Sequence, residues 1–356
     1  MIEPDRPTLL LDVDQCKNNI SRMAAKAKRY SCEFRPHFKT HQSHEIGRWI
    51  RNEGVTGITV SSTSMALYFI EDGWDDITIA FPFYTGMIND LKIIEKSARI
   101  RLFIHEPEHI ALLNKELSNK FKYYIEIDGG YGRSGIEYSD KAKIDQLINS
   151  STNLSKCKFH GFYIHDGRTY KARSINEIKE QISPAVNALS ELKSNYPDAA
   201  ISLGDTPSAS VMENLDTLDE LTAGNFVFYD WMQVQIGSCD INDVALFVIL
   251  PVAQSIKQGK QAIVHGGAVH FSKDSIQTDG SLTYGQAVAI DKNKVSKIEG
   301  AFLSALSQEH GTLNGYDLYP ENDYVTICPI HSCLTANLFK EYHTLDGSVI
   351  EKRILS

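Results

Sequence analysis

The stretch EFRPHFKTH, residues 33–41, starts as a β-prone run and ends in a cluster of basic and polar side chains. It is the first of eight similar runs: Glu33–Phe38, Gly57–Ser61, Asp76–Phe81, Arg99–Ile104, Lys122–Asp128, Lys158–His165, Ala199–Leu203 and Glu220–Ala223. Segments with helical period lie beside or between them at Gln15–Arg29, Met65–Glu71, Met87–Lys96, Ile110–Leu117 and Ile175–Leu192. This spacing is too wide for hairpins and suits βαβ units. Eight repeats predict a closed (β/α)8 barrel of TIM type, with a doubly wound open sheet as the alternative.

Beyond Ile236 the sequence pattern changes from alternating β-prone and helical segments to mainly β-prone segments. β-Prone runs at Val244–Ile256, Gln261–Val264, Tyr324–Cys328 and Ser348–Ile350 are separated by turns rich in Gly, Asp and Asn. We therefore predict an α/β barrel over residues 12–236 and a mostly β domain made of residues 1–11 and 237–356. Barrel enzymes carry their sites at the carboxyl ends of the strands, so the functional cleft is expected there.

Composition and charge exclude several classes of protein. Among the 356 residues 42% are hydrophobic and 23% are charged, as in a globular protein. Asp and Glu number 45 against 36 Lys and Arg, and this net charge of −9 argues against nucleic acid or an anionic membrane as partner. No apolar stretch reaches the roughly 18–20 residues that cross a bilayer, and the amino terminus lacks a cationic signal sequence, so we expect a soluble, cytoplasmic protein. The six scattered cysteines predict reduced thiols.

Lys39 stands at the carboxyl end of the first predicted strand, with His37 and His41 on either side. Partial burial and cationic neighbours would lower the pKa of its amine, which would suit a Schiff-base lysine. The alternative is an ordinary lysine whose chain reaches from the strand end to solvent.

Two further strand ends carry groups that could bind a ligand. The fifth run leads into IDGGYGRSG, residues 127–135, where glycines permit close approach of a ligand and Arg133 offers a guanidinium to an aromatic nitrogen, a phenolate or a carboxylate. Its spacing is not that of a dinucleotide fingerprint, and a glycine-rich turn with a surface arginine is the alternative. The sixth run leads into YIHDGRTY, residues 163–170, where His165 and Tyr170 could orient a cofactor oxygen or a substrate carboxylate.

The seventh and eighth strand ends, SLGDTPS at 202–208 and TAGNFVFYD at 222–230, have the composition of phosphate-binding loops. Phosphate sites after strands seven and eight recur in barrels. In the β domain, CPIHSC at 328–333 places His331 and Cys333 two residues apart on one side of an extended segment. Imidazole and thiolate are good zinc ligands, although a lone H-x-C is weak evidence for a metal.

Taken together, these stretches resemble the two-domain pyridoxal-phosphate (PLP) enzymes of the alanine racemase fold (fold type III), specifically the D-serine dehydratase and D-threonine aldolase group. The resemblance extends over nearly the whole chain. It implies that Lys39 forms a Schiff base with PLP, that Arg133 lies beside the cofactor ring, and that His165 and Tyr170 face cofactor and substrate. It further implies a phosphate site at Thr206, Gly224 and Asn225 and a metal site, zinc or another divalent ion, at His331 and Cys333.

The cysteine at position 333 favours the dehydratases of this group, because the aldolases carry aspartate at the matching position. The resemblance therefore implies a PLP- and zinc-dependent lyase that converts a β-hydroxy D-amino acid into a keto acid and ammonia, and it implies a homodimer. An aldolase, a racemase and a non-catalytic PLP-binding protein are the alternatives. Two residues depart from the group's pattern: Arg168, where a smaller or less basic residue is usual, and His265, where an acidic one is common. We expect Lys39, Arg133, Arg168 and the metal to supply local positive charge.

Overall fold

The computed structural model describes residues 5–258, 260–278, 280–291, 294–319 and 323–353. The first four and last three residues of the predicted β domain therefore lie outside the described residues. The chain forms two compact units. One consists of Arg22–Gly224 and is called the barrel unit below; the other consists of the residues up to Ser21 and from Asn225 onward and is called the β unit. In the sequence, the division between Ser21 and Arg22 falls within helix α1 (Val13–Arg29).

The barrel unit contains a ring of eight parallel strands, as predicted. These are β2 (Glu33–Phe34), β3 (Ile58–Val60), β4 (Asp76–Pro82), β5 (Arg99–Phe103), β6 (Phe121–Asp128), β8 (Cys157–Ile164), β9 (Ala200–Leu203) and β10 (Glu220–Leu221). From β3 to β10 each strand pairs with the next in this order, and β10 pairs with β2. An isolated parallel bridge between His37 and Thr59 joins the chain after β2 to β3 and closes the ring. The short β7 (Ile136–Glu137) pairs with β6 on the side.

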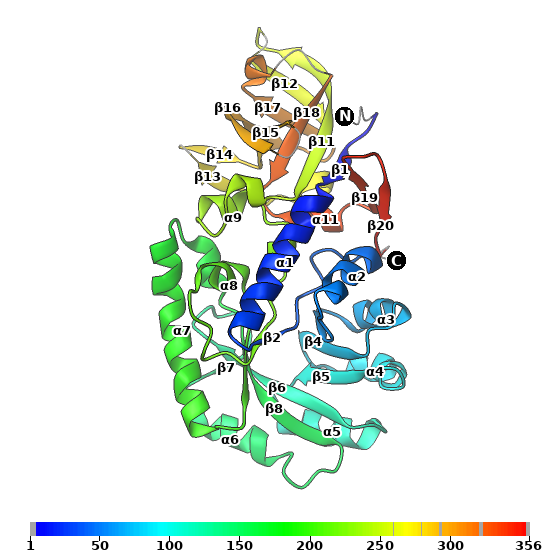
Figure 1. Cartoon of the computed structure of the whole chain (residues 1–356), viewed down its shortest axis with the longest axis vertical. Helices are drawn as coiled ribbons and strands as arrows, with labels where there is room; N and C mark the ends of the chain where they lie inside the picture. Colours follow the sequence, from blue (N-terminus) through cyan, green and yellow to red (C-terminus); the bar gives the residue numbers. More distant parts are fainter. Residues whose placement is uncertain (1–4, 259, 279, 292–293, 320–322, 354–356) are drawn as a thin grey trace. The chain divides into compact units, whose positions relative to one another are not determined.

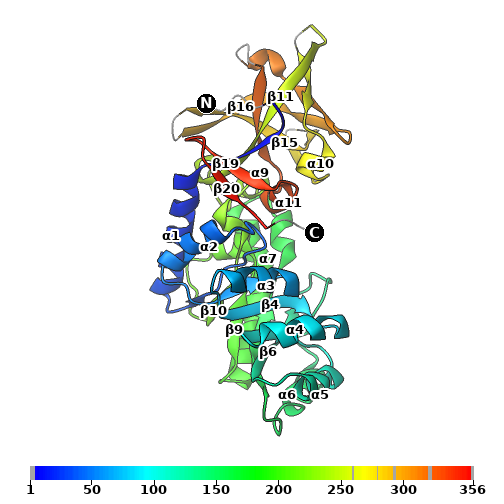
Figure 2. The same cartoon turned by 90° about the vertical axis from the view of Figure 1, so that its right-hand side faces the viewer.

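Helices cover the outside of this ring (Figures 1 and 2). They are α2 (His44–Asn52), α3 (Thr63–Glu71), α4 (Ile88–Ile94), α5 (Pro107–Glu116), α6 (Lys141–Asn149), α7 (Ile175–Asn195) and α8 (Thr206–Val211). In the longest, α7, Ser174 accepts a hydrogen bond from the backbone N–H of Glu177 and so caps the helix. Its buried side chains recur every three or four residues, at Ile178, Ile182, Ala185, Leu189 and Leu192, which gives one apolar face toward the strands.

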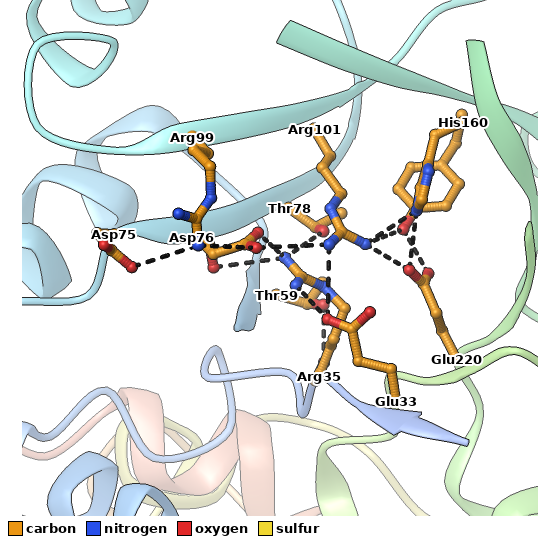
Figure 3. A network of polar contacts seen from close by, with 11 residues as sticks. Glu33, Arg35, Thr59, Asp75, Asp76, Thr78, Arg99, Arg101, His160 and Glu220 are labelled. Carbon is orange, nitrogen blue, oxygen red and sulfur yellow. Dashed lines mark hydrogen bonds and ion pairs between the residues drawn. The ribbon is translucent and has the colours of Figure 1, made fainter. Parts of the chain in front are cut away.

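An ionic network lies near the amino-terminal ends of the barrel strands and is partly buried (Figure 3). It comprises Glu33, Arg35, Asp76, Arg99, Arg101, His160 and Glu220, together with the hydroxyls of Thr78 and Tyr124. The Arg35 side chain is fully buried; its guanidinium donates to Glu33 Oε1 (2.8 Å) and Asp76 Oδ1 (2.6 Å). Because these charges lie at the end opposite to the predicted site, we call them the floor network and assign them to the stability of the barrel.

The β unit contains a largely antiparallel sheet. Its strands are β1 (Thr8–Leu11), β11 (Leu246–Ile256), β12 (Gln261–His265), β15 (Gly285–Asp291), β16 (Lys294–Leu306), β17 (His310–Asn314), β18 (Tyr324–Pro329), β19 (Glu341–Thr344) and β20 (Val349–Glu351). The pairings β12-β17-β16-β15-β18-β11 close on themselves, because β11 also pairs with β12. β1 extends the sheet by pairing with β11 and, in parallel, with β19. The amino-terminal strand thus belongs to the same sheet as strands more than 230 residues later.

Smaller elements complete the β unit. A separate hairpin is formed by β13 (Ile276–Thr278) and β14 (Ser281–Thr283), and three short helices are α9 (Trp231–Gln235), α10 (Ala268–Phe271) and α11 (Ser332–Asn337). The core of the sheet is apolar, as in β11, where Leu246 to Leu250 are all buried. Among the described residues, no helix has the length and apolar character needed to cross a membrane.

Candidate active site

Lys39 lies just after the bridge that closes the barrel, at the carboxyl end of the strand ring. Its backbone N–H donates to Nδ1 of His37 (3.4 Å), and the buried Phe38 ring packs edge-on against His41 at 4.5 Å between centroids. His37 and His41 are both buried, whereas Lys39 is exposed, so the expected partial burial of the lysine is wrong. The side chains on either side of Lys39 are therefore packed in the interior, while Lys39 itself is exposed.

The cationic neighbours expected for Lys39 are present. Burial, and after it the charges of Lys39, His165, His41 and Arg133, hold the pKa of His37 well below its usual range. Burial and the charges of Lys39 and Arg133 lower the pKa of His165 to about 3, against the hydrogen bond that His165 makes with the Gly204 backbone. Side chains from the ends of β2, β6 and β8 thus share one positive field, in which both histidines are neutral at pH 7.

The loop after β6 fixes Arg133. Asp128 at the end of β6 accepts hydrogen bonds from the backbone N–H groups of Gly130 (2.9 Å) and Gly132 (3.1 Å), which folds the glycine-rich segment back on the strand. Arg133 is half exposed; its guanidinium lies 4.0 Å from Glu126 Oε1 and 5.5 Å from the centroid of the Tyr131 ring. It is positioned as a cation that a ligand could still reach.

Arg168 differs from the expectation. Its Nε and Nη2 donate to the two oxygens of Asp166, at 2.8 and 2.5 Å, and Nη2 also donates to the Gln181 carbonyl (3.1 Å). Asp166 is fully buried, so this bidentate ion pair neutralises the arginine. The prediction that Arg168 adds local positive charge is therefore wrong for the observed arrangement.

The predicted phosphate loops close around the same strand ends. Asp205 caps α8 by accepting from the Ser208 N–H (2.8 Å) and also accepts from Thr169 Oγ1 (3.0 Å). Tyr170 Oη accepts from the Thr206 N–H (3.4 Å), and the Tyr170 and His165 rings lie 6.2 Å apart. The structure thus brings His165, Tyr170 and Thr206 together.

Gly224 lies against the loop that carries Lys39. A Cβ atom at this position would stand 2.7 Å from the His37 carbonyl oxygen and 2.8 Å from Thr40 Oγ1, closer than any real Cβ contact. The His37 N–H also donates to the Ala223 carbonyl (3.1 Å). Only glycine therefore lets the end of β10 approach the Lys39 loop this closely.

Asn225, His331 and Cys333 belong to the β unit, where they form a second cluster. The Asn225 amide nitrogen donates to Asp230 Oδ2 (2.7 Å), Ser332 Oγ (2.9 Å) and Cys333 Sγ (3.5 Å). Asp230 Oδ2 also accepts from the Ser332 N–H (2.9 Å). Asn225 Oδ1 is buried and has no hydrogen-bond partner among the described residues. Asp230, which has no predicted role, therefore ties the segment after the barrel to the His331 loop.

His331 and Cys333 are adjacent in space, but not on an extended segment as predicted. His331 is the extended residue before α11, and Cys333 lies in the first turn of that helix. His331 Nδ1 bonds Asp274 Oδ2 (2.9 Å). Although burial opposes it, this bond and a hydrogen bond with Cys333 raise the pKa of His331 to about 10. A carboxylate on Nδ1 leaves Nε2 as the nitrogen that would bind a metal, an arrangement that recurs around zinc. Asp274 lies 57 residues away and could not be found from spacing.

Comparisons with known proteins identify the fold family. Residues 11–230 match the family model of the alanine racemase N-terminal domain. The chain belongs to this family. Residues 245–345 match a serine dehydratase domain. A D-serine dehydratase of Dictyostelium discoideum is 26% identical over 96% of this chain and 93% of its own. The D-threo-3-hydroxyaspartate dehydratase of Delftia sp. (strain HT23) is 28% identical over 97% and 96%, respectively.

Solved structures agree with this assignment. The structure of the Delftia dehydratase superposes with a TM-score of 0.89 at 26% identity and covers 99% of both chains. A D-threonine aldolase from Filomicrobium marinum, at 22% identity and a TM-score of 0.84 over 98% of this chain and 94% of its own, shares the fold. The prediction of an alanine racemase-type barrel followed by a β domain is confirmed.

Proposed function

We propose that this protein is a PLP- and zinc-dependent lyase that eliminates water from a β-hydroxy D-amino acid, with D-serine as the first candidate, to give a keto acid and ammonia. The observation that carries the proposal is the donor set of the β unit. His331, whose Nδ1 is bonded to the Asp274 carboxylate, and the neighbouring thiol of Cys333 are ligand types that zinc prefers. A racemase or a PLP carrier has no use for such a pair, and full-length relatives named as dehydratases support the choice.

The residues of the barrel unit fit an anionic aldehyde cofactor. Lys39 is exposed in a field shared with Arg133, so its amine can reach a carbonyl while the field favours negative charge. Arg133, His165 and Tyr170 would line the ring. Thr206 and Gly224 would hold the phosphate together with Asn225, the residue that follows Gly224 and begins the β unit. PLP, when bound, supplies the electron sink that makes loss of the Cα proton possible.

Side chains of the protein would carry out the other parts of the reaction. Lys39 Nζ, the amine at the carboxyl end of the strand ring, would serve as the base for the Cα proton. His37 and His165 are neutral and can hold oxygen atoms of cofactor or substrate without adding charge. His331 and Cys333 would hold the metal, whose Lewis acidity would assist departure of the β-hydroxyl. Asp274 would keep the His331 ring oriented.

The deciding experiment compares products. Purified protein with PLP and zinc is given D-serine, D-threo-3-hydroxyaspartate or D-threonine, with separate readouts for keto acid, aldehyde plus glycine, and inverted enantiomer. Keto acid and ammonia in equal amounts are expected. Glycine and aldehyde without keto acid would establish the aldolase instead, and an inverted enantiomer alone would establish a racemase. The homodimer implied by the resemblance stays a prediction, which light scattering of the purified protein would test.

A further inference from the structure

A group of metal-ligating side chains that the proposed reaction does not use lies elsewhere in the β unit. His265 at the end of β12, His270 in α10 and Glu309 in the turn between β16 and β17 each offer one ligand atom, and these three atoms lie within 4.8 Å of one another. His265 Nε2 is 3.8 Å from Glu309 Oε2. The geometry points to a second divalent-metal site, formed by two imidazoles and one carboxylate, distinct from the site at His331 and Cys333.

The backbone that carries the three ligands is rigid. Gly266 N–H donates to the Glu309 carbonyl (2.8 Å), and Ala268 N–H donates to the Ser307 carbonyl (2.8 Å). A Cβ at Gly267 would lie 2.2 Å from the Gln308 oxygen, so glycine allows the segment to dock directly on the turn. The turn itself is closed by a hydrogen bond from Ser307 N–H to the His310 carbonyl (2.8 Å). The Cα positions of all three ligands are thus fixed before a metal arrives.

One ring nitrogen of His270 is left available for a ligand from outside the protein. His270 is half-buried, its ring packs 5.8 Å from the Phe339 ring and 5.7 Å from the His265 ring, and its Nδ1 is buried without a hydrogen-bond partner among the described residues. An imidazole with an unsatisfied ring nitrogen next to a carboxylate is a suitable pair of ligands for a cation.

The expected ion follows from the ligand types and the space. Two imidazoles and one carboxylate suit zinc and similar transition metals, whereas calcium and magnesium prefer oxygen ligands. Around a tetrahedral zinc with bonds of about 2.0–2.1 Å, ligand atoms lie about 3.3 Å apart. His265 and Glu309 are exposed, so rotation of their side chains can close the remaining distance. One water would complete the shell.

Metal stoichiometry in a double variant tests this site independently of the proposed reaction. Full-length His331→Ala/Cys333→Ala protein, which lacks the proposed catalytic metal ligands, is stripped with a chelator, dialysed against zinc and measured by elemental analysis. One zinc per chain is expected, and adding His270→Ala or Glu309→Ala should abolish it. Cobalt in the same background should give visible d–d bands without the thiolate charge-transfer band that Cys333 would produce.

His343→Ala in that background tests whether a further imidazole that lines the same pocket as His265 and His270 belongs to the ligand set. His343 pairs with a single carboxylate, Glu341 at 3.1 Å, and should not affect the zinc content. Absence of zinc from the double variant, or zinc retained by both His270→Ala and Glu309→Ala proteins with native circular dichroism, would overturn the site. Loss of zinc in the His343→Ala protein would overturn the proposed ligand set. Failure of the native protein in the lyase assay, together with one zinc bound in the double variant, would count against the proposed function alone.

Discussion

Replacing Glu220 by glutamine should destabilise the barrel unit by about 3 kcal/mol at pH 7. Glu220 is 2% exposed and accepts hydrogen bonds from Arg101, Tyr124 and His160 in the floor network (Figure 3). Burial opposes its charge, but the bond from His160 and the charge of Arg101 prevail and lower its pKa from 4.5 to about 2. At 1.36 kcal/mol per pKa unit this difference corresponds to about 3 kcal/mol of stabilisation. Removal of one partner of a buried ion pair costs a similar amount, about 3–5 kcal/mol.

The pH dependence has a defined sign. Because the pKa of Glu220 is lower in the folded than in the unfolded chain, its contribution is fully present above pH 4.5 and is lost as the pH falls toward 2. The difference in unfolding free energy between the native protein and Glu220→Gln should therefore be constant from pH 8 to about 6 and shrink on acidification below 4.5.

Urea unfolding, monitored by hydrogen exchange of the amides in β5 and β10, measures the unfolding free energy of the barrel unit separately from that of the β unit. Glu213→Gln is the matched control, since Glu213 pairs with Lys179 at 2.7 Å but is 84% exposed, and such surface pairs contribute about 0–1 kcal/mol. A loss below 1 kcal/mol for Glu220→Gln, or a loss that grows on acidification, would refute the assignment of the floor network to stability.

Three further variants test the proposed active site. In the native protein, borohydride should attach the bound cofactor covalently to the chain. Lys39→Ala should abolish the visible absorbance of the bound cofactor and also turnover. A cofactor absorbance band that survives dialysis of the variant would count against the role of Lys39. Gly224→Ala inserts a methyl group 2.7 Å from the His37 carbonyl, so we expect about 1–3 kcal/mol of destabilisation and a lower cofactor affinity, measured by titration. Asp274→Asn should lower the affinity of the His331 and Cys333 site for its metal about 10–100-fold. The affinity can be measured by removing cobalt with a chelator while following the charge-transfer band between the Cys333 thiolate and cobalt. A chelator concentration at the midpoint that equals that of the native protein would contradict the role of Asp274.

Much of the fold could be predicted because the barrel repeats a local pattern. All eight barrel strands lie within one or two residues of their predicted starts, but β2 ends four residues early, since Pro36 cannot donate a backbone hydrogen bond. Helix α2 was not predicted: it has nine residues and contains Gly47, which packs against Phe38. The hairpin of β15 and β16 was also missed, because a bulge between Gln286 and Val288 interrupts its alternation.

The site was predictable only where its residues lie at strand ends. Lys39, Arg133 and His165 follow three different strands, and the barrel topology alone brings those ends together. Asp274 and Asp230 act through contacts formed between distant segments, which no local pattern encodes. The same limit applies to the second metal site, whose histidines stand close in sequence while Glu309 arrives from a separate hairpin.

The distribution of charge bears on substrate choice in this acidic protein. Arg168 is held by both oxygens of Asp166, and His37 and His165 are neutral at pH 7, so none of the three offers a free positive charge to a ligand. Lys39 would be consumed by its bond to the cofactor, which leaves Arg133, half exposed beside Tyr131, as the cation of the predicted site set. A second carboxylate on the substrate would need a further cation. Either the proposed metal, which is already expected at the β-hydroxyl, or an Arg168 released from Asp166 would have to supply it. The observed pairing therefore favours a substrate with a single carboxylate, such as D-serine, over D-threo-3-hydroxyaspartate.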